Sequence, residues 1–369
     1  MQAGKSWQEG NHNMDDLLVE TVPVEVRVEN GVGRITLNRP KALNALTTAM
    51  CALMAETLRK WAADDAVKIV MIDYEEGTRG FCAGGDIRVV ARSGRGDGRE
   101  AADFFATEYK LNTLIKRFPK PYLAVMDGIT MGGGVGISVH GSHRVATERT
   151  VFAMPETGIG LFPDVGGGWF LPRLEGELGT WLALTGAQLR GADVLAAGIA
   201  THFVRDVSTM KEAVLAGDYG VDAGARLSAI LARFSEKAGT PTYAEHRESI
   251  NRCFAKATMT DIIIALKMDD TEWSQDQADI LAHRSPLSMS VSLQALREGA
   301  RMASFEDNMR MEYRIACRIT RTHDFLEGVR AVLEDKDNRP RWEPISLCHV
   351  KPDMIDQMFA PLDRELELK

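Results

Sequence analysis

Hydrophobic and polar positions first alternate with a period of two and then recur every three or four residues. From Pro23 to Leu37 the alternation surrounds Asn30 and Gly31, a pairing that predicts a β-hairpin. From Thr47 to Trp61 apolar residues lie on one stripe of a helix. The pattern therefore predicts two strands followed by an amphipathic helix that packs on them.

The same alternation of element types continues along the next hundred residues. The expected elements are a strand at 69–72, a helix at 99–117, a buried strand at 122–126, a glycine-rich turn leading into a short apolar helix that ends at His140, and a strand-like segment at 144–153. Strands interleaved with helices are typical of the α/β class.

Beyond about residue 205 the strand patterns stop. Helical stripes replace them, such as Leu227, Ile230, Leu231 and Phe234. No Pro- or Ser-rich linker separates the two parts. We therefore expect an α/β core over residues 21–205 and a helical C-terminal region over residues 206–369 packed on that core.

The composition says little about the fold, but it excludes several classes of function. The chain has 369 residues, 45% hydrophobic and 26% charged, which is ordinary for a globular protein, and its length alone would suggest two domains. No apolar run approaches the roughly 18 residues of a membrane helix. The net charge, 44 − 52 = −8, offers no basic surface to nucleic acid or anionic lipid. A small-molecule partner fits these properties best.

The N-terminus and the cysteines indicate a reducing compartment. Residues 1–20 contain only Lys5 as a base and no apolar or Arg-rich segment, which predicts a disordered leader and a cytoplasmic protein. Met14 is an alternative start, so the status of residues 1–13 stays open. The five cysteines lack CxxC or Cys/His spacing, and no group of His, Cys and acids has metal-ligand spacing. We expect free thiols and no metal.

Two glycine-rich turns are candidates for anion binding. Residues 80–86 read GFCAGGD after the strand at 69–72, and six of the fifteen residues at 127–141 are glycine, at the start of an apolar helix. Backbone N–H groups at such turns can hold a developing oxyanion. The alternative is that the glycines only permit close packing. Neither turn fits a dinucleotide or triphosphate motif.

Two acids stand in an otherwise uncharged stretch. Of the 23 residues at 150–172, only Glu156 and Asp164 are charged. Burial raises the pKa of a carboxyl toward the range useful for proton transfer, so the pair is a candidate site. The alternative is that each acid caps a turn or is solvated. Glu108 lies on the apolar stripe of the helix at 99–117, where an acid is unusual, unless it reaches the surface or pairs with an arginine.

The chain resembles the crotonase, or enoyl-CoA hydratase/isomerase, superfamily from about Val22 to its C-terminal tail. The motifs that carry the resemblance are ITLNRPKALNAL at 35–46, FCAGGDI at 81–87, PYLAVMDGITMGGGVGIS at 121–138 and MPETGIGLFPDVGGGWFLPRL at 154–174. With HDFLEGVRAVLEDKD at 323–337, they are most similar to the 3-hydroxyisobutyryl-CoA hydrolase branch of that superfamily.

This resemblance implies a fold, a substrate and site residues. The fold would be a spiral of ββα turns with a helical C-terminal region. The substrate would be an acyl-CoA, so that no separate cofactor is needed. The implied catalytic residues are Gly85 and Gly133, whose N–H groups hold the thioester oxygen, together with Glu156 and Asp164. Glu108 would contact the substrate beside Gly133, Glu156 and Asp164, and the stretch along the CoA moiety would comprise Lys41, Ala42, Ala83 and Asp86.

One departure from the superfamily distinguishes between reactions. The hydratases of the superfamily use two glutamates, and the first of these positions is Gly136 here. We therefore expect hydrolysis of a short 3-hydroxyacyl-CoA, above all 3-hydroxyisobutyryl-CoA in valine catabolism, by attack of Glu156 or of a water that it activates. Two alternatives stay open: a hydratase or isomerase using Glu156 with Asp164 or Glu108, and a non-catalytic acyl-CoA-binding homologue. A homo-oligomer is also open, since crotonase relatives often form trimers or hexamers.

Overall fold

The computed structural model describes residues 23–368, and the leader expected at residues 1–20 lies outside them. One sheet has six strands in the order β1-β2-β3-β4-β6-β9, and a second has three in the order β5-β7-β8. The larger sheet comprises β1 (Val24–Glu29), β2 (Val32–Leu37), β3 (Ile69–Tyr74), β4 (Tyr122–Met126), β6 (His143–Ala146) and β9 (His202–Phe203). The smaller comprises β5 (Ile129–Met131), β7 (Val151–Ala153) and β8 (Leu189–Arg190).

Helices of the α/β part join these strands. They are η1 (Pro40–Ala42), α1 (Thr48–Ala63), α2 (Ile87–Gly94), α3 (Arg99–Lys116), α4 (Gly133–Gly136), η2 (Glu156–Ile159), α5 (Gly167–Phe170), η3 (Leu171–Arg173), α6 (Leu178–Thr185) and α7 (Gly191–Ala196). Only β1–β2 in the larger sheet is antiparallel, and the other neighbouring strands of that sheet run parallel. The α/β class expected from the pattern is confirmed.

The first three predicted elements are confirmed closely. Asn30 and Gly31 have φ of 49° and 80°, the left-handed values that a two-residue hairpin turn needs. The Thr47 hydroxyl accepts the N–H of Met50 at 3.2 Å and caps α1. Trp61, near the end of α1, lies against β2, since a Cβ at Gly33 would be 2.6 Å from its ring.

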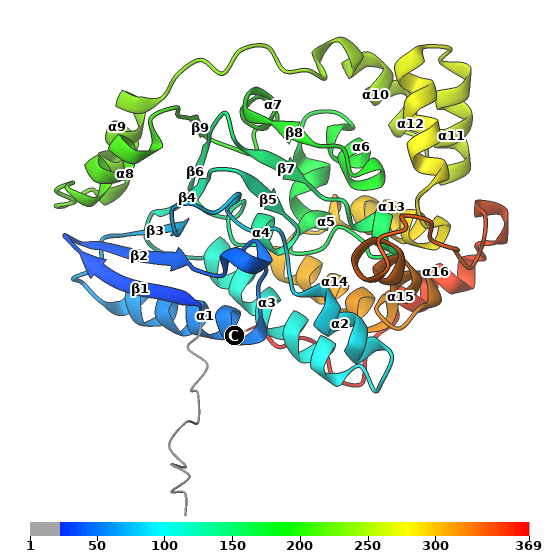
Figure 1. The fold of residues 1–369 in the computed structure, drawn as a ribbon, viewed down its shortest axis with the longest axis horizontal. Helices are drawn as coiled ribbons and strands as arrows, with labels where there is room; N and C mark the ends of the chain where they lie inside the picture. Colours follow the sequence, from blue (N-terminus) through cyan, green and yellow to red (C-terminus); the bar gives the residue numbers. More distant parts are fainter. Residues whose placement is uncertain (1–22, 369) are drawn as a thin grey trace, which may run out of the picture.

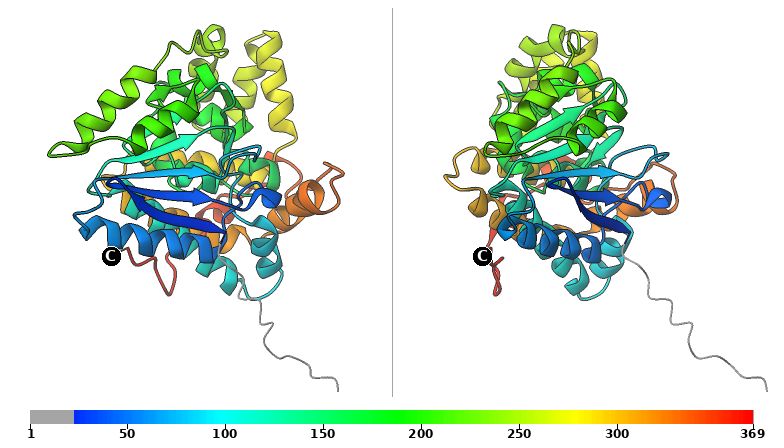
Figure 2. Two further views of the ribbon diagram at one scale, coloured as in Figure 1. Left: turned by 60° about the vertical axis from the view of Figure 1, so that its left-hand side comes forward. Right: turned by 90° about the vertical axis from the view of Figure 1, so that its left-hand side faces the viewer.

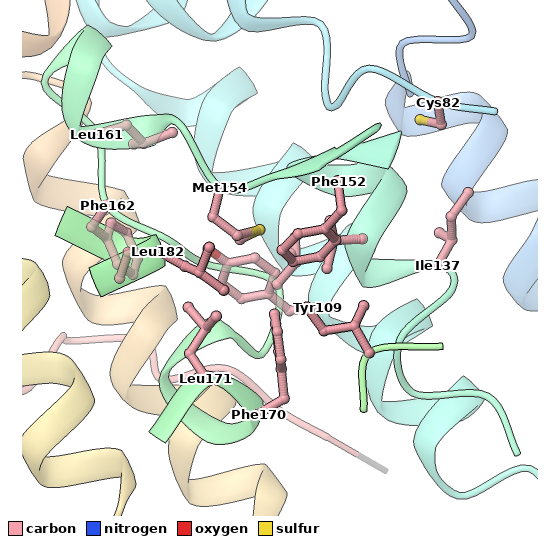
Figure 3. Close-up of a cluster of buried hydrophobic side chains, with 14 of the residues drawn as sticks. Cys82, Tyr109, Ile137, Phe152, Met154, Leu161, Phe162, Phe170, Leu171 and Leu182 are labelled. Atoms are coloured by element: carbon pink, nitrogen blue, oxygen red, sulfur yellow. The ribbon is translucent and has the colours of Figure 1, made fainter. Parts of the chain in front are cut away.

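The larger sheet is covered on both faces because successive residues of a strand point to opposite sides. In β3, Val70 and Ile72 belong to the main core, together with the buried residues of α1 and α3. Ile69 and Met71 belong to a second cluster, against the C-terminal helices α8 (Val207–Leu215) and α9 (Ala223–Phe234). Figure 3 shows part of the main core, with Tyr109 of α3 among side chains from β7 and the segment that follows it.

The single strand expected at 144–153 is wrong. The segment forms β6 and β7, which belong to different sheets. Between them, the N–H of Thr147 donates to the Thr150 hydroxyl at 2.7 Å, and that hydroxyl donates to the carbonyl of Met126. The polar run in this turn redirects the chain, and the turn separates the two strands. The apolar helix expected to reach His140 is also shorter, since α4 ends at Gly136.

The C-terminal region is helical, as expected, and β9 is the last strand within residues 23–368. Its helices are α8 (Val207–Leu215), α9 (Ala223–Phe234), η4 (Ala244–His246), α10 (Arg247–Phe254), α11 (Met259–Met268), α12 (Glu272–Ala282), α13 (Pro286–Gly299), α14 (Phe305–Ile319), α15 (His323–Val329), the π-helical turn η5 (Arg330–Glu334), η6 (Leu347–His349) and α16 (Pro352–Phe359). No helix in the described part of the chain is long and apolar enough to cross a membrane.

These helices cover the α/β part at separate places. Helices α8 and α9 cover one face of the larger sheet, and a long connection leads across the molecule to α10, α11 and α12 on the opposite side, next to α6 (Figures 1 and 2). Helix α14 packs on α3, α13 packs on α5 and α6, and α15 packs on η2. The contacts made with α3, α5 and η2 matter most, because these three elements carry or flank the candidate site.

Candidate active site

The two glycine-rich turns lie against each other. The first follows β3, and the second joins β5 to α4. The N–H of Cys82 donates to the carbonyl of Ile129 at 2.9 Å, and the N–H of Met131 donates to the carbonyl of Cys82 at 3.0 Å. A Cβ at Gly84 would lie 3.9 Å from the backbone nitrogen of Gly133. These short-range contacts bring the backbones of Gly85 and Gly133 to the same small cavity.

Glycine is required where these turns meet the acids. Gly132 has φ 46° and ψ −121°, a backbone conformation that L side chains rarely adopt. A Cβ at Gly133 would lie 2.5 Å from Oε1 of Glu108. Within residues 23–368, neither the N–H of Gly85 nor that of Gly133 donates to a backbone carbonyl, so both are available to an oxyanion.

Three buried carboxyls complete the cavity. Glu156 is the first residue of η2, and its Oε1 lies 3.3 Å from the Cβ position of Gly132. Glu108 comes from α3, and within the described residues its Oε1 and the Oε2 of Glu156 have no hydrogen-bond partner. Oδ2 of Asp164 accepts the hydroxyl hydrogen of Tyr109 at 2.7 Å. The structure thus brings together the five residues expected at the reacting end of the site.

The cavity is small, and every charged residue that lines it is an acid. Its volume is about 80 Å³, well below the roughly 300–1,000 Å³ of drug-sized ligand sites, which suits a short acyl group. The residues that line it include no Lys, Arg or His. This lining places three carboxyl groups close together, with no cationic side chain among the lining residues to stabilise a negative charge.

Burial and mutual repulsion shift the acidity of these groups. Burial, and then the negative charge of Asp164, raise the pKa of both Glu108 and Glu156 well above the usual range. Burial raises the pKa of Asp164 to about 7, and the hydrogen bond from Tyr109 opposes that rise. Carboxyls with raised pKa values can exchange protons near neutral pH, as general acid–base chemistry requires.

The position of the second hydratase glutamate is filled by neighbouring side chains. A Cβ at Gly136 would lie 2.7 Å from Cβ of Val165 and 2.7 Å from Nδ2 of Asn112. Val165 has φ 51°, a strained value for a β-branched residue. A glutamate at position 136 therefore could not be accommodated without moving the Val165 loop and the Asn112 side chain.

The residues expected along the CoA moiety lie next to the first glycine turn. Lys41 is exposed and Ala42 half-buried in η1, and the N–H of Ala83 donates to the carbonyl of Leu43 at 3.0 Å. Ala83 also lines the cavity. The carboxylate of Asp86 is paired with Arg39 at 2.9 Å. These contacts hold η1, with the exposed Lys41, beside the cavity.

Sequence reasoning missed Tyr109, Asn112, Val165 and Glu312. The carboxyl group of Glu312 on α14 accepts the N–H groups of Gly166 and Gly168 at 2.7 and 2.9 Å. Its position on the buried stripe with Met309 and Ile315 is the same kind of signal that pointed to Glu108, and it could have been found.

A larger cavity, of about 460 Å³, lies at the carboxyl ends of β3 and β4. Its buried acids are paired: Asp73 with Lys211 at 3.3 Å and Asp127 with Arg149 at 3.1 Å. This cavity exceeds the smaller one in volume, but its buried acids are held in ion pairs. Of the two cavities, the smaller one has carboxyl oxygens without a hydrogen-bond partner within residues 23–368, beside the N–H groups of Gly85 and Gly133.

Comparison with known proteins shows the family to which the chain belongs. The family model described as enoyl-CoA hydratase/isomerase matches residues 32–359, and the chain belongs to this family. Within it, the chain is 46% identical over 344 residues to 3-hydroxyisobutyryl-CoA hydrolase, mitochondrial, of Danio rerio, covering 91% of this chain and 89% of that protein. The protein of the same name from Homo sapiens is 44% identical, covering 89% and 86%.

Solved structures with the same fold carry other names. A structure titled as a carnitinyl-CoA dehydratase from Mycobacterium thermoresistibile is 44% identical, with a TM-score of 0.88 over 94% of this chain and 99% of that chain. One titled as an enoyl-CoA hydratase from Rhodobacter sphaeroides is 38% identical, with a TM-score of 0.83 over 92% and 98%. The fold expected from the resemblance is confirmed. The titles of these structures name reactions other than hydrolysis, so the names alone do not identify one reaction.

Proposed function

We propose that this protein hydrolyses a short 3-hydroxyacyl-CoA thioester, most directly 3-hydroxyisobutyryl-CoA, to the free acid and CoA. In an organism that degrades valine, this step would belong to valine catabolism. The names of the curated relatives support the substrate, and the small cavity supports a short acyl chain. Coenzyme A enters with the substrate, so the reaction needs no other cofactor.

The chemistry follows from what faces the cavity. The N–H groups of Gly85 and Gly133 would hold the thioester oxygen as it gains negative charge. Glu156 would attack the carbonyl carbon to form a mixed anhydride that water then cleaves, or would take a proton from a water that attacks. In both routes the C–S bond breaks, water supplies the new oxygen of the acid, and the sulfur of CoA takes a proton. Asp164 would receive the 3-hydroxyl, and Glu108 would contact the acyl group.

The observation that favours hydrolysis over hydration is that the space next to Gly136 is already occupied. Hydration in the superfamily uses a second glutamate there, and Val165 and Asn112 leave it no room. The hydratase and dehydratase titles of two related structures keep that reaction as the alternative within enzymes, with Asp164 or Glu108 replacing the missing acid. A non-catalytic acyl-CoA binder is the alternative of another class, and the intact Glu156 beside two free N–H groups argues against it.

Three expectations from the sequence stay proposals. Lys41, Ala42, Ala83 and Asp86 would lie along the CoA moiety. A homo-oligomer stays open. A cytoplasmic location is proposed from the composition of the first twenty residues, whereas the curated relatives are named as mitochondrial.

One experiment separates the three functions. The protein is incubated with 3-hydroxyisobutyryl-CoA, 3-hydroxypropionyl-CoA and crotonyl-CoA while free thiol and enoyl absorbance are followed together. Thiol release from the hydroxyacyl esters alone supports hydrolysis. Loss of enoyl absorbance without thiol would instead identify a hydratase, and binding without either change a non-catalytic protein.

Replacing Glu156 tests its role. Glu156→Gln should lower thiol release at least about a hundredfold, because the amide neither attacks nor takes a proton, while substrate binding stays largely intact. Glu100→Gln, at the exposed start of α3, is the matched control and should keep full activity. Normal turnover by Glu156→Gln would contradict the proposed role.

A further inference from the structure

The loop that carries Asp164 is held in place from three other parts of the chain. The carbonyl of Val165 accepts a hydrogen bond from Nε2 of His140 at 2.7 Å, and Glu312 accepts the N–H groups of Gly166 and Gly168. Burial lowers the pKa of His140 to about 3, so its ring is neutral. These contacts maintain the strained φ of Val165, which the loop alone would not keep.

Tyr109 makes the remaining contact, and it is the one that reaches the carboxylate. Its hydroxyl is fully buried and lies 2.7 Å from Oδ2 of Asp164. Its ring packs edge-on or tilted against Phe105 and Tyr313, at centroid distances of 5.6 and 6.5 Å, and it lies within the core shown in Figure 3. Because the ring cannot move without disturbing that core, the hydroxyl is a fixed donor.

Helix α3 thereby contributes to two sides of the cavity, the side of the glycine-rich turns and the side of the Asp164 loop. Glu108 and Tyr109 are neighbours in sequence and point about 100° apart around the helix. Glu108 faces the N-terminus of α4, and Tyr109 faces the Asp164 loop. With Oδ2 engaged by Tyr109, Oδ1 of Asp164 is the oxygen left for a hydroxyl of the substrate.

We infer that Tyr109 is a positioning residue for Asp164, which fixes the carboxylate so that its ionised form presents Oδ1 to the 3-hydroxyl of the substrate. The inference rests on the proposed function, since it takes Asp164 as the group that receives this hydroxyl. It extends that function by naming what makes the enzyme selective for hydroxylated acyl chains.

Charge in the site gives this hydrogen bond its importance. Besides Tyr109, the titratable side chains within residues 23–368 that face Asp164 are Glu108 of α3, Glu156 of η2 and Glu312 of α14, all acids. The neutral His140 lies behind the loop. A hydroxyl donor favours the charged form of a carboxyl, and Tyr109 is the side-chain donor on Asp164. Without it, the negative charge would be held less firmly on Asp164.

Tyr109→Phe tests the inference through selectivity. The variant removes one oxygen and keeps the ring. It should lower kcat/KM for 3-hydroxyisobutyryl-CoA by about tenfold, since a hydrogen bond to a charged group is lost, and leave the slower hydrolysis of isobutyryl-CoA nearly unchanged. Tyr313→Phe, a hydroxyl deletion in the neighbouring ring, is the matched control and should keep the wild-type preference.

The ionisation of Asp164 is measured separately by the binding of a non-hydrolysable thioether analogue of 3-hydroxyisobutyryl-CoA as a function of pH. Wild-type binding should weaken as pH falls through about 7, the pKa of Asp164. In Tyr109→Phe that midpoint should rise by about one pH unit. In an Asp164→Asn background, Tyr109→Phe should have little further effect on either readout.

Each failure has a distinct meaning. If the wild type hydrolyses both esters equally, the proposed role of Asp164 fails, and the inference fails with it. If the wild type prefers the hydroxyacyl ester and Tyr109→Phe keeps both the preference and the binding midpoint, only the inference is overturned. A loss equal in the presence and absence of Asp164 would also overturn it, because it would show a general effect on the fold.

Discussion

The two walls of the cavity are built in different ways. On one side, the turns at 83–86 and 131–134 meet through backbone atoms and need glycine because side chains would collide. On the other side, the loop at 164–168 is held by side chains of Tyr109, His140 and Glu312, which come from distant parts of the chain. The first wall offers fixed backbone donors, and the second offers a carboxylate whose orientation and charge depend on its neighbours.

This difference suggests a division of labour. Backbone donors cannot titrate, so the oxyanion side should work alike for many acyl-CoA reactions of the family. On the proposed function, the acid side would decide which reaction follows, because Asp164 lines the cavity that would take the acyl chain and Val165 closes the space beside Gly136. If this holds, changes to the first wall should abolish activity broadly, and changes to the second should alter stability and selectivity.

The largest effect is expected at the first wall. Gly133→Ala would place a Cβ 2.5 Å from Oε1 of Glu108 and 3.2 Å from the backbone of Gly84. The carboxylate must move and the turn must shift, so the oxyanion donor is misplaced, which should cost about a hundredfold in kcat for every acyl-CoA hydrolysed. Steady-state rates on hydroxylated and unhydroxylated esters check this. A loss confined to hydroxylated esters would contradict the division proposed here.

At the second wall, the contribution of Glu312 to stability should fall as pH rises from about 6.5 to 8. Histidines also titrate near the lower end of this range, and they do so alike in the wild type and in a Glu312 variant, so the difference between the two isolates Glu312. Burial raises the pKa of Glu312 from its ordinary 4.5, the value expected in the unfolded chain, to about 8 in the folded protein. The folded state therefore keeps a proton that the unfolded state has already lost, and this stabilisation disappears as pH rises through about 8. The loss from Glu312 between pH 6.5 and 8 should be about 2 kcal/mol.

Chemical unfolding at several pH values measures that slope. Glu312→Gln carries no titrating proton at this position and should flatten the decline by the same amount, although Asp164, with its pKa of about 7, still contributes. Glu272→Gln, exposed at the start of α12, should leave the slope unchanged. A wild-type slope that Glu312→Gln leaves unaltered would mean that Glu312 is already ionised in the folded protein.

The features built from local contacts could be predicted from the sequence, and those built from long-range contacts could not. The hairpin, α1, β4 and both glycine turns depend on residues close in sequence, and local patterns located them. The hydrogen bonds that hold the Asp164 loop join residues that are far apart in the sequence. Tyr109 lies 55 residues from Asp164, and Glu312 lies 146 residues from Gly166. Periodicity places such residues on a buried face but cannot say what they meet. The split of 144–153 into β6 and β7 was missed because apolar alternation does not show which sheet a strand joins.

The smallest effect tests the contact that separates the proposed reaction from hydration. Gly136→Ala would bring a Cβ within 2.7 Å of Cβ of Val165 and should destabilise the protein by about 1–3 kcal/mol through overpacking. Val165→Gly removes the opposing atom and also relieves the positive φ, at the cost of a buried side chain. In that background Gly136→Ala should cost about 1 kcal/mol less, and the remaining cost reflects Asn112, whose Nδ2 lies equally close. Strict additivity in this double-mutant cycle would show that Val165 does not close the position, and the structural argument against a second glutamate would then rest on Asn112 alone.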